Sequence, residues 1–82
     1  MLELVYDHLR QSRLLEADRM LAALLLQRPR DPAVHRARAI AAQMAGRIDI
    51  AIEALRTAID LDPASVALQM EFGQLLASNG YV

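Results

Sequence analysis

One pattern of alanine, leucine and proline occurs twice in this chain, and the second copy lies 34 residues after the first. The first copy is Ala17, Leu21, Leu24 and Pro29, and the second copy is Ala51, Leu55, Ala58 and Pro63. Gly46 and Gly80 have the same separation. A fixed period of this length in a helix-forming sequence is typical of stacked helical hairpins. The sequence therefore predicts an all-α repeat array, a kind of structure that mostly holds other proteins.

Glycines and prolines separate five stretches rich in alanine, leucine and arginine, which favour helix. The expected helices are about 2–11, 14–28, 32–45, 48–61 and 65–78. Asp31 followed by Pro32 predicts an N-cap and a first helical residue, and Ser65 predicts another N-cap. Gly46 is expected to end the third helix in a left-handed conformation. Because the turns are short, successive helices should pack antiparallel as hairpins.

Small residues indicate where these helices would approach each other closely. Ala17, Ala51 and Ala54 are expected at the contacts within the hairpins. Ala39 and Gly73, again 34 residues apart, are expected to serve the same purpose on the first helix of a hairpin.

Composition excludes several classes of function. The chain has 82 residues, a formal net charge of −1 and no cysteine, so disulfides and thiolate sites are excluded and no nucleic-acid footprint is indicated. No cofactor or metal is expected. All nine basic residues are arginine, which together with abundant alanine suggests a bacterial source. No signal peptide or membrane-spanning segment is visible, and a cytoplasmic location is expected.

These residues resemble a tetratricopeptide repeat. Residues 51–63 are similar to the second helix of that repeat, 46–48 to its preceding turn and 72–76 to its first helix. The resemblance implies a single domain with units at about 1–31, 32–65 and a partial third unit at 66–82. It also implies that the hairpins stack in a right-handed superhelix.

The chain departs from the family pattern at several positions. Met1, His35 and Gln69 occupy the tryptophan position, and Ser12 stands where a turn glycine is expected. Arg38 and Ala42 replace large apolar residues of the second unit.

The resemblance implies a concave groove that binds a peptide or helix of a partner protein. The candidate lining residues are Tyr6, Leu9, Arg36, Ile40, Gln43, Met44, Met70 and Gln74. The alternative is that some of these belong to the core. The lysines and asparagines with which some family members hold a peptide carboxylate are replaced, since the matching positions carry Leu2, Tyr6, Ala37, Ala67 and Glu71. A mixed apolar and acidic segment, or an amphipathic helix, would suit this groove.

The fifth helix is apolar around more than half of its circumference. Such a helix is expected to have two neighbours, whereas terminal repeats normally present a polar outer face. Phe72, Leu75 and Leu76 are therefore candidates for self-association through this helix, giving a homo-oligomer. The chain would otherwise be a fragment of a longer protein, and the remaining alternative is that it simply ends there.

Catalytic motifs are lacking in the sequence. His8 and His35 have no partners at metal-ligand spacing, and the paired carboxylates near helix ends are typical of solvated surfaces. The leading hypothesis is a non-catalytic protein–protein interaction scaffold. The alternative is an oligomerisation or docking fragment of a larger protein with a catalytic domain elsewhere.

Overall fold

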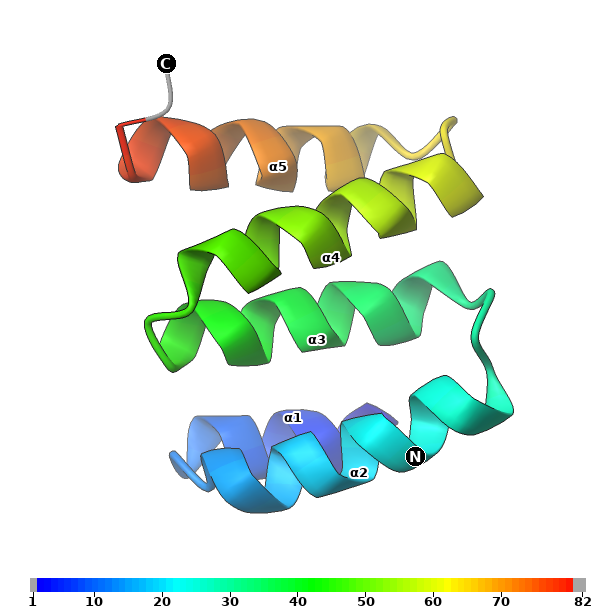
Figure 1. Ribbon diagram of the computed structural model, residues 1–82, viewed down its shortest axis with the longest axis vertical. Helices are drawn as coiled ribbons and strands as arrows, with labels where there is room; N and C mark the ends of the chain where they lie inside the picture. Colours follow the sequence, from blue (N-terminus) through cyan, green and yellow to red (C-terminus); the bar gives the residue numbers. More distant parts are fainter. Residues whose placement is uncertain (1, 81–82) are drawn as a thin grey trace.

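The computed structural model describes residues 2–80, which form five α-helices and no strand (Figure 1). The helices are α1 (Leu2–Arg10), α2 (Leu14–Gln27), α3 (Pro32–Met44), α4 (Ile48–Leu61) and α5 (Val66–Ser78). Every bound lies within one residue of the bound expected from the sequence. Met1, Tyr81 and Val82, which fall in the expected first and third units, lie outside the described residues.

Side-chain caps fix the starts of α3 and α5. The Asp31 carboxylate accepts a hydrogen bond of 3.0 Å from the backbone N–H of Ala33, and Pro32 is the first residue of α3. The Ser65 hydroxyl accepts a hydrogen bond of 3.3 Å from the backbone N–H of Leu68. Both caps satisfy backbone donors that the first helical turn leaves free, and both predictions are confirmed.

Left-handed residues end the first helix of each hairpin and recur at the sequence period. The backbone φ angle is 60° at Ser12, 78° at Gly46 and 79° at Gly80. These positions follow α1, α3 and α5, and each lies 34 residues from the next. The prediction for Gly46 is confirmed, and Ser12 adopts the same conformation without the freedom that glycine has.

The hydrogen bonds of the first two of these turns are also equivalent. The backbone N–H of Arg13 donates to the carbonyl of His8 at 2.7 Å, and that of Arg47 donates to the carbonyl of Ala42 at 2.8 Å. In both cases the bond spans five residues and satisfies a carbonyl at the helix end, as in a Schellman motif. The chain therefore reverses in the same way after α1 and after α3.

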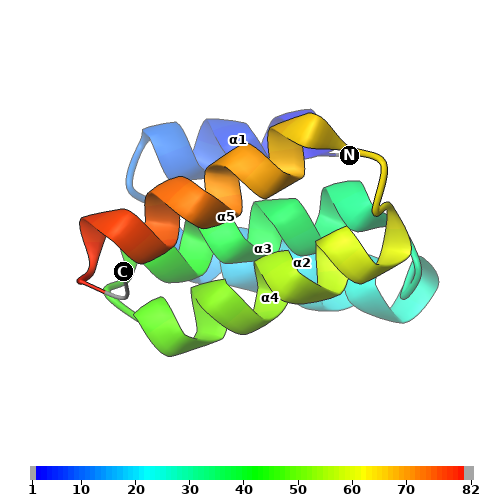
Figure 2. The same cartoon turned by 90° about the horizontal axis from the view of Figure 1, so that it is seen from above.

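The helices stack along the long axis of a molecule measuring 32 × 24 × 17 Å (Figure 1). Seen from above, α1 and α5 lie on one side, α2 and α4 on the other, and α3 lies between them (Figure 2). The contact between α3 and α4 is the most extensive between any two helices. The predicted all-α fold of antiparallel repeats is confirmed.

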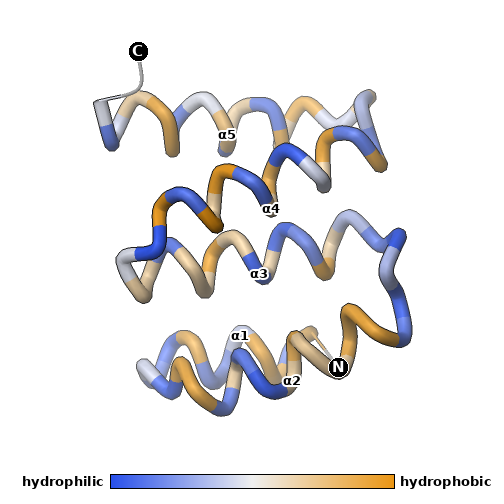
Figure 3. Tube along the Cα trace, viewed as in Figure 1, coloured by the Kyte–Doolittle hydropathy of each residue, from blue (hydrophilic) through white to orange (hydrophobic). Residues whose placement is uncertain are grey.

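Two clusters of buried residues form the core, and α3 contributes to both. Hydrophobic and hydrophilic residues alternate along every helix, α5 included (Figure 3). The first cluster joins α1, α2 and α3 and consists of Val5, Leu9, Ala17, Leu21, Leu24, Val34, Ala37 and Ala41. The second joins α3, α4 and α5 and consists of Ala39, Ala42, Ala51, Ala54, Ala58, Leu55, Leu68 and Leu75. Each cluster joins three consecutive helices, so the fold is stabilised by contacts between neighbouring helices along the array.

The small residues expected at close contacts behave differently from one another. Ala17, Ala51, Ala54 and Ala39 are at most 1% exposed, as expected for close helix packing. Gly73 is exposed, and a Cβ atom added there would meet no other atom within 4 Å. The prediction is therefore wrong for Gly73, because no described helix covers the face of α5 that carries it.

Candidate functional site

The groove candidates lie on α1, α3 and α5, and the side of the array that these helices share is called the concave face. In the view from above, α3 is set back relative to α1 and α5 (Figure 2). Seven of the eight groove candidates retain exposed surface. Tyr6, Arg36 and Ile40 are half-buried, whereas Gln43, Met44, Met70 and Gln74 are exposed.

Leu9 does not belong to this surface. Its side chain is 3% exposed and packs in the first core cluster between α1, α2 and α3. The assignment of Leu9 to the groove is therefore corrected: α1 turns this side chain toward α2 and α3, where burial stabilises the fold by about 1.5–3 kcal/mol.

A hollow of about 170 Å³ lies between α3 and α5. It brings together three of the predicted residues, Ile40 and Gln43 from α3 and Gln74 from α5. The other lining residues are Ala39, Leu55, Glu71, Leu75 and Ser78. This hollow combines apolar side chains of Ala39, Ile40 and Leu55 with the polar groups of Gln43, Glu71 and Gln74, which suits a short apolar side chain and a peptide backbone.

A second hollow of about 360 Å³ lies where α3 and α5 begin. It contains one predicted residue, Arg36. The remaining lining residues are Pro32, Ala33, Asp62, Ser65, Ala67, Leu68 and Glu71. Tyr6, Met44 and Met70 line neither hollow.

An ion pair joins α3 to α5 beside these hollows: Glu71 lines both of them, and Arg36 lines the second. The Nε of Arg36 donates to both carboxylate oxygens of Glu71 at 2.8 Å. This hydrogen bond raises the pKa of the Arg36 guanidinium above its usual value, against the opposing effect of partial burial. Tyr6 of α1 makes a smaller contribution in the same direction. Arg36 is therefore held in place and already neutralised by this chain.

The sequence does not pair Glu71 with Arg36 directly; it marks Glu71 as a departure from the carboxylate-binding pattern and as part of a polar stripe on the fifth helix, whereas in the structure Glu71 borders both hollows. The available signal was its separation of 35 residues from Arg36, one more than the period. Residues one period apart occupy equivalent positions on α3 and α5, so a separation close to the period places two side chains on facing helices.

His35 has a structural hydrogen bond. Its Nε2 lies 2.8 Å from the carbonyl oxygen of Pro29, and since a carbonyl only accepts, Nε2 must donate. One period later, Gln69 Nε2 donates to the carbonyl oxygen of Pro63 at the same distance. Both side chains connect the start of a first helix to the turn before it. Among the described residues, no group of three histidines or carboxylates is placed to hold a metal ion.

The candidates for self-association occupy different environments on α5. Leu75 is 2% exposed and packs in the second core cluster, so it is not available on the surface of this structure. Phe72 and Leu76 are half-buried, and the Arg56 guanidinium of α4 lies over the Phe72 ring at 5.9 Å from its centroid. The large apolar side chains that α5 exposes most are Val66 and Met70, which are 67% and 61% exposed.

Stacked antiparallel hairpins with a recurring left-handed turn define a helical-repeat protein. Comparison with protein-family models identifies the repeat: a tetratricopeptide repeat model matches residues 2–65 and 37–81. The chain belongs to the tetratricopeptide repeat family. Comparisons with curated proteins and with solved structures gave no significant match.

Repeats of this family generally mediate protein–protein interaction, and the family is typically non-catalytic. Within residues 2–80, none of the helices has the length and apolar character needed to cross a membrane.

Proposed function

We propose that the concave face binds an extended or helical segment of a partner protein, without catalysis. The observation that supports this most directly is the pair of hollows that share Glu71, the partner of Arg36 in the ion pair between α3 and α5. One segment lying across α3 and α5 would place an apolar side chain near Ile40 and polar groups near Gln43 and Gln74. Tyr6, Met44 and Met70 would contact the parts of the segment that extend beyond the hollows.

Because Arg36 is already paired with Glu71, the groove favours a partner segment that does not need an unpaired arginine for binding. Since both Glu71 oxygens already accept from Arg36, an acidic group of the partner would have to compete with a chelating carboxylate. The apolar part of the segment would therefore supply most of the affinity, and the polar contacts would fix its orientation.

Ile40→Asp and Arg36→Glu test this assignment by affinity capture with quantitative mass spectrometry. Both are expected to reduce recovery of a saturable partner at least about tenfold, by burying a charge in the hollow or by placing two carboxylates together. Arg19→Glu, an exposed change on α2, is the control. Unchanged recovery with Ile40→Asp, while circular dichroism shows a folded chain, would exclude this face.

A charge exchange separates recognition from folding. Arg36→Glu combined with Glu71→Arg restores an ion pair with the opposite polarity. If the pair only supports the fold, the double variant should recover binding that Arg36→Glu loses. If the partner binds the positive charge of Arg36 directly, recovery of the partner with the double variant should remain low.

A second candidate function is association of two copies through α5. It is favoured by the exposed side chains of Val66 and Met70 and by the uncovered face at Gly73. Sedimentation of the wild type and of Met70→Glu tests it, with Phe72→Glu as a change at a partly covered position of the same helix. A concentration-dependent dimer that Met70→Glu dissociates is expected, and a monomer at all concentrations would contradict the proposal.

A further inference from the structure

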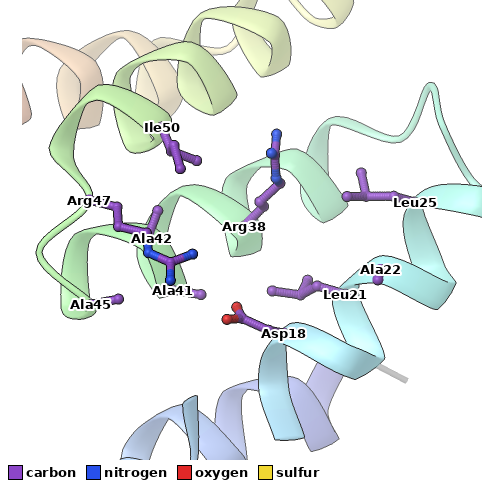
Figure 4. A pocket seen from close by; sticks show the side chains of 10 residues that line it. All are labelled: Asp18, Leu21, Ala22, Leu25, Arg38, Ala41, Ala42, Ala45, Arg47 and Ile50. Atoms are coloured by element: carbon purple, nitrogen blue, oxygen red, sulfur yellow. The ribbon is translucent and has the colours of Figure 1, made fainter. Parts of the chain in front are cut away.

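A trough lies away from the concave face, on the side where α2 and α4 pass over α3. It has a volume of about 280 Å³ and is shown in Figure 4. Its lining residues are Asp18, Leu21, Ala22, Leu25, Arg38, Ala41, Ala42, Ala45, Arg47 and Ile50. None of them lines either concave hollow. The trough is therefore a surface separate from the proposed groove.

The trough exists because α3 carries small residues where α5 carries large ones. Ala41 and Ala42 correspond, one period later, to Leu75 and Leu76. Leu75 is buried and Leu76 is half-buried, so these positions of a first helix accommodate leucine. Each replacement of leucine by alanine removes three carbon atoms from the space between α2 and α4. The hollow is consequently encoded by the small residues of α3.

Apolar side chains form the floor and walls of the trough. Leu21 and Ala41 are each 2% exposed and lie at its base, while Leu25 of α2 and Ile50 of α4 are half-buried along its sides. Since the volume is below the roughly 300–1,000 Å³ of typical small-molecule pockets, the trough fits one or two apolar side chains of a protein segment better than a cofactor.

Charge determines which segment fits. Arg38 and Arg47 are exposed at the rim, and Figure 4 shows both side chains among the lining residues. Among residues 2–80, neither guanidinium takes part in an ion pair or side-chain hydrogen bond, and Asp18 at the α2 edge is likewise unpaired. Two unpaired arginines beside an apolar floor complement a segment that combines apolar side chains with carboxylates.

Nucleic acid is disfavoured as the occupant. The trough contains no aromatic side chain on which a base would stack, and its apolar floor and walls offer nothing to a sugar–phosphate backbone. We propose that this trough is a second docking surface, which binds an acidic amphipathic segment of a protein by inserting apolar side chains between α2 and α4.

NMR titration with two synthetic helical peptides tests the proposal. The first peptide has a leucine stripe flanked by glutamates, and the second has lysines in place of the glutamates. The glutamate peptide is expected to shift the methyl signals of Ala41, Ala42 and Ile50. It should bind at least about tenfold more tightly than the lysine peptide, and its affinity should fall as the salt concentration rises.

Two sets of variants locate the binding. The double variant Arg38→Glu, Arg47→Glu should lower the affinity for the glutamate peptide at least about tenfold. Ala45→Leu, an exposed change that fills part of the trough, should weaken it as well, whereas Ala23→Leu, an exposed alanine of α2 outside the trough, should not.

Three results would overturn the proposal: no saturable shift at these methyl groups, equal binding of the two peptides, or shifts centred on Ile40 of the concave face. The last result would support the proposed groove instead, so the two surfaces are distinguished by one titration.

Discussion

Replacing Ser12 by glycine should stabilise this protein, although the change removes a side chain. Ser12 has a φ angle of 60°, in the left-handed region that glycine occupies at Gly46 and Gly80. A non-glycine residue there is destabilised by roughly 1–2 kcal/mol, and no hydrogen bond of the Ser12 hydroxyl would be lost. Glycine also gives the unfolded chain more conformational freedom, and this opposing effect reduces the gain in stability by about 0.4–1 kcal/mol. The net stabilisation is therefore about 0.5–1 kcal/mol.

For a domain of this size, that gain corresponds to a rise in Tm of roughly 2–8 °C, measured by circular dichroism during heating. Gln11→Gly is the matched control, because Gln11 lacks the positive φ angle and its replacement only adds freedom to the unfolded chain. Gly46→Ser should be destabilising by about 1 kcal/mol, and the added Cβ would meet no atom within 4 Å, so the effect is conformational. An unchanged or lower Tm for Ser12→Gly, or an equal rise for Gln11→Gly, would refute the reasoning.

Two further predictions concern residues of the first helices. His35→Ala should lower stability by about 0.5–1.5 kcal/mol because the bond to the Pro29 carbonyl is lost, whereas His35→Gln should retain it, since Gln69 makes the equivalent bond; equal losses in a urea titration would contradict this. Gly73→Ala should raise stability by about 0.5–1 kcal/mol because the added methyl meets no atom within 4 Å in a helix interior; a decrease in Tm of the monomer would show that the α5 face is covered.

Local signals in the sequence were sufficient to predict the helices and their ends. Asp31 and Ser65 carry cap side chains, and Gly46 carries the conformational freedom that its turn requires. Such features depend on a few neighbouring residues, so they do not require knowledge of the tertiary structure. The period then places equivalent residues at equivalent positions in successive units.

The surface was harder to predict, because a helix with apolar residues on most sides does not reveal which of them faces the core. Leu9 and Leu75 were assigned to outer surfaces, yet both are buried. Their orientation depends on how neighbouring hairpins are rotated relative to each other. The Arg36–Glu71 pair was missed for the same reason, since it joins α3 to α5, which are not consecutive in the chain.

The residues of α3 connect these observations. This helix lies between the two core clusters, with Ala37 and Ala41 in one and Ala39 and Ala42 in the other. Burying leucine instead of alanine at one position would add about 2 kcal/mol at roughly 0.8 kcal/mol per carbon, so these alanines give up stabilisation that α5 obtains from Leu75. What they provide is close approach of helices on both sides and an open trough between α2 and α4. This helix therefore contributes to the proposed groove through Arg36, Ile40 and Gln43. It contributes to the proposed second surface through Ala41 and Ala42, whose small side chains leave space for a partner to supply the missing contacts.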